Sequence, residues 1–454
     1  MGIYYNHEYS SWKFHRNVLI KSVTFPKFLK GIVMELQEQF KELENYWDDM
    51  ETVESEPKYS NDQNSLSNDK AKDDNKKHDA SINASKSNGD KIIDISKWIN
   101  RFTFDIFLQS ITRKKSFSMA NYFNQISKDE ENKLKGIECL LNECNQFINK
   151  LKNSLWLLDQ FNFVLIGLPK WFEKIFLVYK LYNRKYFKDY WWLYETLLKI
   201  VQTRRFEISC SPKEPDLKAD LLTSLINFGT SHPTDVKSEN ERALTDEEIV
   251  SNSFSYIIYY ICKYPTIKYR MIEEIDSILG NHHDTFTYFM IGKLYFCEAV
   301  IKEVLRIHPV HPLISRVLNE KDNVGGFTWN LGQMFFINLH AIQNHKYNWK
   351  NPDEFNPERF LYLEKEEEEK VLNKNENHFI KEELERKTLF AFGMGVRSCP
   401  AKDLAMIMLK TMVVMFLRKY DVILVDQEEL QINYENMLNI CDELKVKIRS
   451  RNHK

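Results

Sequence analysis

The residues with the clearest chemical potential lie close together near the C-terminus, in the segment 392–401. Cys399 follows Gly395 and Arg397 there, and the run 402–419 behind it is apolar with helical spacing. Glycine lets a backbone pass close to a flat ligand, and arginine presents a forked donor to a carboxylate. A thiol just ahead of a helix is favoured as a thiolate by the helix dipole. This arrangement could hold a large anionic cofactor and supply it with a sulfur ligand.

The segment resembles the haem loop of the cytochrome P-450 family, written F-x-x-G-x-R-x-C-x-G. It matches at Phe392, Gly395, Arg397 and Cys399, and it departs at Ala401, where the family has glycine. The resemblance implies that Cys399 is the proximal ligand of a haem iron, with Phe392 packed near the thiolate. A thiolate ligand pushes electron density onto iron and favours O–O cleavage. The alternative is a buried structural thiol, which is how an isolated free cysteine usually behaves.

Three further residues match positions that bind the haem propionates in this family. Trp12 and Arg16 fit the family's W-x-x-x-R segment, and their i, i+4 spacing places them on one face of a helix. Arg316 matches another propionate-binding arginine. Buried carboxylates need matched donors, which an indole N–H and guanidinium groups supply. The resemblance therefore implies that Trp12, Arg16, Arg316 and Arg397 hold the propionates, although a Trp and an Arg one turn apart often simply pack together.

An acid and two bases match a structural network of the same family. Glu303 and Arg306 lie three residues apart in a predicted helix that ends at Pro309, and Arg359 lies in a segment resembling the family's P-E-R-F. In the family these residues form a buried network beneath the haem loop. One carboxylate between two guanidinium groups is chemically sensible only if it is buried and fully hydrogen-bonded. We interpret the three residues as structural rather than catalytic.

The expected long central helix departs from the family pattern. Relative to that pattern about fourteen residues are missing after Leu244–Ile249, close to four helical turns. The missing part includes the acid–alcohol pair that relays protons to iron-bound dioxygen. The catalytic residues therefore stay unassigned, because Ser253 and Ser255 are the only hydroxyls in range and lack an adjacent acid. We interpret both as ordinary serines on the helix surface.

The chain also begins almost at the Trp12 helix, whereas eukaryotic microsomal members carry an anchor, a hinge, a sheet and another helix before it. We expect an N-terminally truncated member of that type, without a signal peptide or anchor. A truncated or misassembled gene model is the favoured explanation, and a degenerate paralogue is the other. The segment 155–168 is apolar but interrupted by Asp159. It could touch a membrane surface or form a buried helix and loop.

Composition sets broad limits on the molecule. The chain has 454 residues, is 43% hydrophobic and carries a net charge of −2, so it can build a large core and offers no case for nucleic acid as a partner. Seven cysteines without disulfide or zinc spacing suit a reducing compartment. We predict one domain over 1–454, lacking its N-terminal part, with a polar disordered insertion at 52–91 and a charged loop insertion at 362–387.

The predicted fold is mainly α with small β-sheets, an incomplete form of the cytochrome P-450 fold. Apolar spacing and helix breakers predict most of its elements. Helices are expected over 10–21, 27–50, 94–113, 131–153, 181–206, 245–279, 287–307 and 402–419, and strands near 313–318, 326–338 and 421–447.

By resemblance, the expected function is that of a haem-thiolate monooxygenase, an iron-binding oxidoreductase that inserts one oxygen atom from O2 into an apolar substrate. The implied cofactor is haem b, with electrons from NADPH through an NADPH-cytochrome reductase. The implied location is the cytosolic face of the endoplasmic reticulum membrane, with possible peripheral contact. Two alternatives remain open. One is a haem-thiolate isomerase or dehydratase of oxygenated lipids, and the other is a non-catalytic haem-binding protein.

Overall fold

A computed structural model describes most of the chain. The described residues are 9–50, 90–127, 140, 142–151, 153–154, 184–210, 221–230, 245–280, 286–318, 320–361, 389–426, 429–435 and 438–451. The predicted loop 362–387 and the apolar segment 155–168 lie outside them, as does most of the predicted insertion 52–91. The last two residues of that insertion are in place, because Lys91 opens a strand and Asp90 pairs with Arg449 through both carboxylate oxygens.

Helices make up most of the described structure, as predicted. The first half of the chain contains α1 (Tyr9–Val23), α2 (Pro26–Asp48), α3 (Ile95–Thr112), α4 (Ser118–Ile126), α7 (Arg184–Cys210) and α8 (Leu221–Thr230). The second half contains α9 (Thr245–Lys263), α10 (Pro265–Leu279), α11 (Tyr288–Gly292), α12 (Tyr295–Ile307), α13 (Leu339–Gln343) and α16 (Lys402–Lys419).

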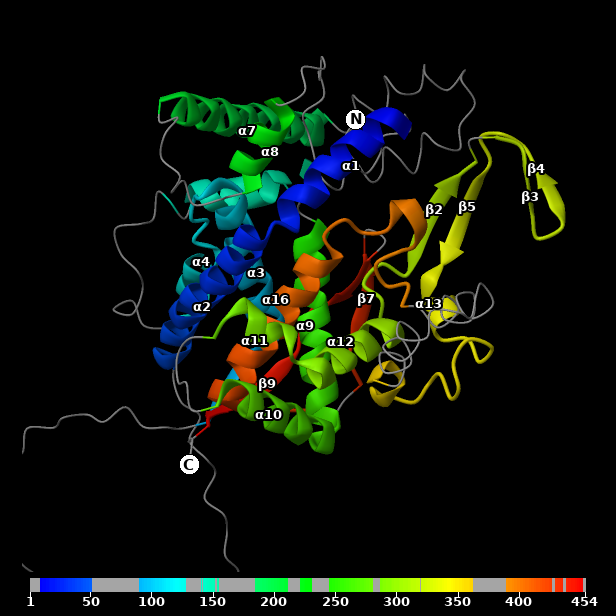
Figure 1. The fold of residues 1–454 in the computed structure, drawn as a ribbon. Coiled ribbons are helices and arrows are strands. Elements are labelled where there is room, and N and C mark those ends of the chain that lie inside the picture. Colours follow the sequence, from blue (N-terminus) through cyan, green and yellow to red (C-terminus); the bar gives the residue numbers. More distant parts are fainter. Residues whose placement is uncertain are drawn as a thin grey trace, which may run out of the picture.

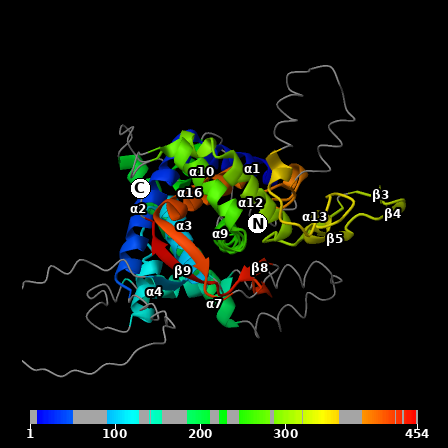
Figure 2. The same cartoon turned by 90° about the horizontal axis from the view of Figure 1, so that it is seen from below.

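The strands form small antiparallel sheets, also as predicted. They are β1 (Lys91–Asp94), β2 (Leu313–Val317), β3 (Asp322–Val324), β4 (Phe327–Trp329), β5 (Met334–Asn338), β6 (Tyr420–Leu424), β7 (Ile432–Glu435), β8 (Leu438–Cys441) and β9 (Lys445–Ser450). The order β1-β9-β6 makes one sheet, and β2-β5, β3-β4 and β7-β8 form three sheets of two strands each. The β3–β4 hairpin stands out from the helical body, as both views show (Figure 1, Figure 2).

The core is built around α9 and α16, which lie side by side at the centre of the molecule (Figure 1). Every residue of α9 from 250 to 261 is buried. Phe254 of α9 meets Phe416 of α16 edge to face, with ring centres 5.9 Å apart. The helices α2, α3 and α12 pack against this pair.

Two of the predicted helices are each divided in two. The stretch 245–279 breaks between Lys263 and Pro265, because proline has no N–H for the helix and disfavours helical geometry in the residue before it. The stretch 287–307 is α11 followed by α12. Glu274 of α10 fixes the start of α12, since its carboxylate accepts the N–H groups of Phe296 and Cys297 at 2.7 and 2.8 Å.

Candidate functional site

The loop that carries Cys399 is shaped by two glycines and closed by backbone hydrogen bonds. Gly393 and Gly395 have φ values of 70° and 66°, in the left-handed region where a side chain would be strained. The N–H of Cys399 donates to the carbonyl of Phe392 at 2.8 Å, and the N–H of Ser398 donates to that of Gly395 at 3.1 Å. These bonds fold the loop back on itself and fix the direction in which the Cys399 side chain leaves the backbone.

The same loop lies directly before α16, where the sequence predicted a helix over 402–419 with these boundaries. Ala401 is the residue that caps the helix, so Cys399 lies two positions ahead of the cap. Pro400 therefore lies just outside the helix, in the turn before it. Phe392 is buried and Cys399 is partly buried against the main core.

One side of the loop is uncovered. A Cβ built on Gly395 would meet no atom within 4 Å. The two apolar side chains beside it, Met394 and Val396, are 48% and 65% exposed. An apolar loop with open space over a glycine suits a flat ligand, because no side chain keeps that ligand away from the backbone.

Helix α1 docks on this loop through two residues one turn apart. The guanidinium carbon of Arg397 lies 3.7 Å from the centre of the Trp12 ring, and Trp12 is 3% exposed. The guanidinium carbon of Arg16 lies 5.6 Å from the centre of the Trp12 ring, and its Nη2 donates to Ser398 Oγ at 3.3 Å. A partly buried guanidinium over an indole face adds cation–π attraction to the packing. The predicted pair Trp12 and Arg16 therefore does meet the predicted loop.

Arg316 approaches the same place from β2. Its Nη1 donates to the carbonyl of Ser315 at 2.8 Å. Burial lowers the pKa of Arg397, and the positive charges of Arg316 and Arg16 lower this pKa further. Burial likewise lowers the pKa of Arg16, while the nearby Cys399 opposes this effect. Arg16 and Arg316 thus both lie near Arg397 of the Cys399 loop, and the three guanidinium groups are a donor set suited to a ligand carrying two carboxylates.

Sequence reasoning missed Ser398, whose hydroxyl accepts from Arg16. Replacing Ser398 by alanine should lower the free energy of unfolding by about 1 kcal/mol, the usual contribution of one hydrogen bond. In an Arg16→Ala background the same change should have almost no further effect, since the donor is already gone. Urea unfolding of the four proteins measures this coupling. Equal losses in both backgrounds would show that the contact contributes nothing.

Behind the loop, Glu303, Arg306 and Arg359 form one network. Glu303 and Arg306 are fully buried, and Arg306 forms a two-pronged pair with Glu303 at 2.8 and 3.0 Å. Arg359 Nε adds a bond to Glu303 Oε1 at 3.2 Å, and the N–H of Asn356 adds another at 2.9 Å. The remaining donors of Arg306 reach the carbonyls of Gln343 and Pro352 at 2.9 and 2.7 Å. The structure therefore brings together the three residues that the sequence grouped.

The two serines of α9 are not on the helix surface, so that interpretation is wrong. Ser253 and Ser255 are 0% and 1% exposed, because α9 is surrounded by other elements. Ser255 Oγ donates to the carbonyl of Ser251 at 3.2 Å. Ser253 Oγ has no hydrogen-bond partner among the described residues. The stretch 250–263 contains neither Asp nor Glu, so no acid adjoins these hydroxyls.

Comparison with known proteins identifies the family. A family model described as "Cytochrome P450" matches residues 71–448, and the chain belongs to that family. Members of this family are haem-binding monooxygenases, which generally use redox partners and apolar substrates. The predicted family and the predicted fold, mainly α with small sheets, are both confirmed.

Two curated relatives illustrate the similarity. A steroid 17-alpha-hydroxylase/17,20 lyase of Squalus acanthias is 30% identical over 231 residues, which cover 46% of this chain and 42% of the relative. A trans-cinnamate 4-monooxygenase of Glycyrrhiza echinata is 35% identical over 155 residues, which cover 34% of this chain and 28% of the relative. The matched part spans less than half of each of these relatives.

Solved structures give the same fold. The haem domain of cytochrome P450DA superposes with a TM-score of 0.62 and 14% identity, covering 98% of this chain and 79% of that one. A second cytochrome P450 superposes with a TM-score of 0.64 and 15% identity, covering 98% and 83%. Identities this low show the fold alone. Within the described residues, no helix is both long enough and apolar enough to cross a membrane.

Haem fits the residues at this loop. The cofactor needs an iron ligand, an uncovered backbone beside its flat ring and donors for two carboxylates. Cys399 can supply the ligand, the open face at Gly395 the uncovered backbone, and the guanidinium groups of Arg16, Arg316 and Arg397 the donors. The predicted absence of the acid–alcohol pair stays a prediction. The residues of α9 from 250 onward contain no counterpart of that pair.

Proposed function

We propose that this chain is a haem-thiolate monooxygenase that inserts one oxygen atom from O2 into an apolar organic substrate. The observation that carries the proposal is the Cys399 loop, with its open glycine face and three guanidinium groups converging on its edge. When bound, haem b would supply the iron at which dioxygen is activated. The protein's own part is to hold that group and to keep its sulfur ligand ionised and in place.

Each residue of the site has a distinct part in this proposal. Cys399 ligates the iron, and Phe392 packs beside it and holds the N–H of Cys399 through its own carbonyl. Arg16, Arg316 and Arg397 neutralise the two propionates, with Trp12 as a fourth donor through its indole N–H. The pairing of Arg397 with Trp12 and of Arg16 with Ser398 fixes the loop on α1.

We also propose a redox partner and a cellular location for this chain. Electrons would come from NADPH through an NADPH-cytochrome reductase, and the protein would work at the cytosolic face of the endoplasmic reticulum membrane with peripheral contact. What supports both is the similarity to the steroid hydroxylase, a member of the microsomal group. The substrate is proposed only as small and apolar.

One observation favours a second candidate, a haem-thiolate isomerase or dehydratase of oxygenated lipids. The buried Ser253 and Ser255 have no acid beside them, and the stretch 250–263 contains no acid–alcohol pair that could relay protons toward dioxygen. Such chemistry needs neither O2 nor a reductase. Turnover of a lipid hydroperoxide without NADPH would favour this candidate, and product formation that depends on NADPH, reductase and O2 would favour the monooxygenase.

The ligand assignment is tested by absorption spectroscopy of the full chain expressed with haem, reduced and exposed to CO. We expect the long-wavelength Soret band that marks a thiolate ligand. Cys399→Ala should abolish this band, while Cys297→Ala should keep it, because Cys297 is fully buried beside Glu274 and belongs to the fold. Bound haem without that band in the unmodified chain would leave only a non-catalytic haem-binding protein, and both enzyme proposals would fail.

A further inference from the structure

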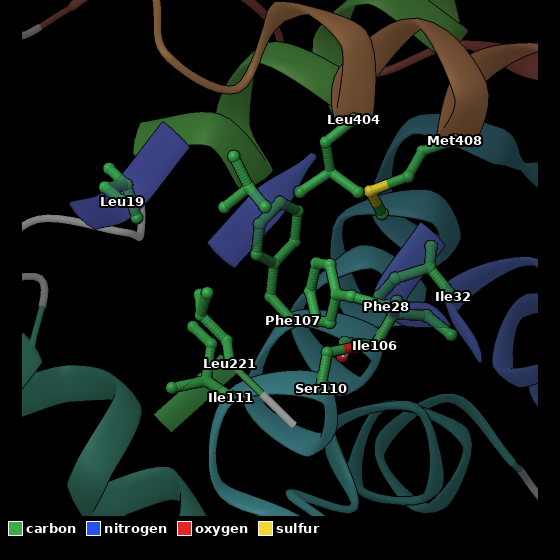
Figure 3. A pocket seen from close by; sticks show the side chains of 11 residues that line it. Leu19, Phe28, Ile32, Ile106, Phe107, Ser110, Ile111, Leu221, Leu404 and Met408 are labelled. Carbon is green, nitrogen blue, oxygen red and sulfur yellow. Dashed lines mark hydrogen bonds between the residues drawn. The ribbon is translucent and has the colours of Figure 1, made fainter. Parts of the chain in front are cut away.

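A second site, separate from the Cys399 loop, lies where five helices meet. It is a cavity of about 20 Å³ lined by side chains of α1, α2, α3, α8 and α16. Figure 3 shows aliphatic and aromatic side chains around it. Those that form its walls include Leu19, Phe28, Phe107, Leu221, Leu404 and Met408.

The lining of this cavity is apolar. Ser110 carries the single side-chain hydroxyl of the lining, and it donates to the carbonyl of Ile106 at 2.6 Å within its own helix. No side chain of the lining is charged. A buried water needs two to four polar partners, and an apolar cavity that offers fewer stays dry and can take up a small apolar molecule. The chemistry of the walls therefore excludes ions and ligands that depend on hydrogen bonds.

The size of the cavity sets the size of the occupant. A volume of about 20 Å³ exceeds the ~10–15 Å³ that one water requires. The cavity can therefore hold one small molecule but not several. An empty cavity lacks van der Waals contacts, because the atoms of its walls have no neighbouring atoms across the gap. A compact apolar occupant restores those contacts and loses no hydrogen bonds to water on entering.

We propose that this cavity binds one small, uncharged, apolar molecule of the size of dioxygen. The site does not depend on haem, because none of Trp12, Arg16 and Cys399 lines it. Its walls nevertheless include α1, which carries Trp12 and Arg16, and α16, which follows the Cys399 loop. Leu19 lies three residues after Arg16 on α1, and Leu404 lies near the start of α16, five residues after Cys399.

Xenon serves as the probe, since it is compact, apolar and unable to hydrogen-bond. The full chain, labelled with ¹³C at its methionine methyl groups, is titrated with dissolved xenon and followed by methyl NMR. The Met408 signal, assigned through Met408→Leu, should shift and saturate. The signal of Met415, buried on the same helix but away from the cavity, should not. A Met408 shift that never saturates, or that Met415 shares, would refute the proposal.

Two variants at one position distinguish the cavity from the remaining core. Ser110→Leu places apolar atoms in the cavity and should abolish the saturable Met408 shift. Ser110→Ala removes only the hydroxyl and should retain it. If Ser110→Leu does not fold, Leu221→Phe fills the space from α8 and carries the same expectation. Xenon binding that persists in a folded, filled variant would overturn the assignment.

Discussion

Replacing Glu303 by glutamine is expected to destabilise the fold by about 3–5 kcal/mol, the usual result of removing one partner from a buried ion pair. Glutamine has nearly the same shape, so the loss arises from charge and hydrogen bonding rather than from a cavity. Arg306, with 0% exposure, would keep its charge without a counter-ion. The amide nitrogen of glutamine would also face the N–H groups of Arg306 and Arg359, which the carboxylate now accepts.

Chemical denaturation of Glu303→Gln and of a matched control measures this effect. Glu358 pairs with Arg270, but the two side chains are 36% and 50% exposed. Glu358→Gln should therefore change the free energy of unfolding by at most about 1 kcal/mol. Equal losses in the two variants would mean that the Glu303 network is no more important than a surface ion pair.

Predictions from the sequence were most accurate where the spacing of residues determines a single local structure. The run 402–419 coincides with α16, because apolar residues recur at helical spacing and Cys399 and Pro400 end the loop before it. Glu303 and Arg306 could be paired because three residues place them on one helical face. Their meeting with Arg359 could be expected only from the resemblance, since nothing local to 359 determines which helix it packs against.

Other features depend on tertiary packing, which spacing does not encode. Ser253 and Ser255 look like surface residues because they are polar, yet α9 is enclosed by neighbours on all sides and buries them. The contact of Arg397 with the Trp12 ring joins residues far apart in the chain, and both were assigned to a ligand rather than to each other. Ser398 gave no signal at all, because a lone serine beside a cysteine is common in loops of any kind.

A buried histidine predicts how stability depends on pH. His308 ends α12, and its Nε2 lies 3.0 Å from the hydroxyl of Tyr260 on α9, with the Tyr256 ring close by. Burial, together with the smaller effect of the charges of His340 and Arg306, lowers the pKa of His308 to about 4. Burial raises the pKa of Tyr260, so the tyrosine stays protonated and its hydroxyl shares a hydrogen bond with the neutral imidazole of His308.

Because the folded pKa of His308 is depressed, the unfolded chain binds more protons than the folded chain between about pH 6.5 and pH 4. Stability should fall as pH falls through this window, by up to about 3 kcal/mol from this one group. His308→Gln keeps an acceptor for Tyr260 but cannot titrate. As the pH is lowered from 7.5 to 4, the His308→Gln variant should therefore gain up to about 3 kcal/mol of stability relative to the unmodified chain. Urea unfolding of both proteins at each pH measures this gain.

The informative quantity is the difference in unfolding free energy between His308→Gln and the unmodified chain at each pH. Asp105 makes this subtraction necessary, because it changes stability with pH in the opposite direction. Burial raises its pKa to about 6 despite hydrogen bonds from Ser116, Ser118 and Met119, so its contribution to stability falls as pH rises from about 4 to 6. Subtracting one protein's pH profile from the other cancels this term. Tyr260→Phe should preserve the His308 effect, since burial is its largest cause. If Tyr260→Phe removed the effect, the hydrogen bond rather than burial would be holding His308 neutral.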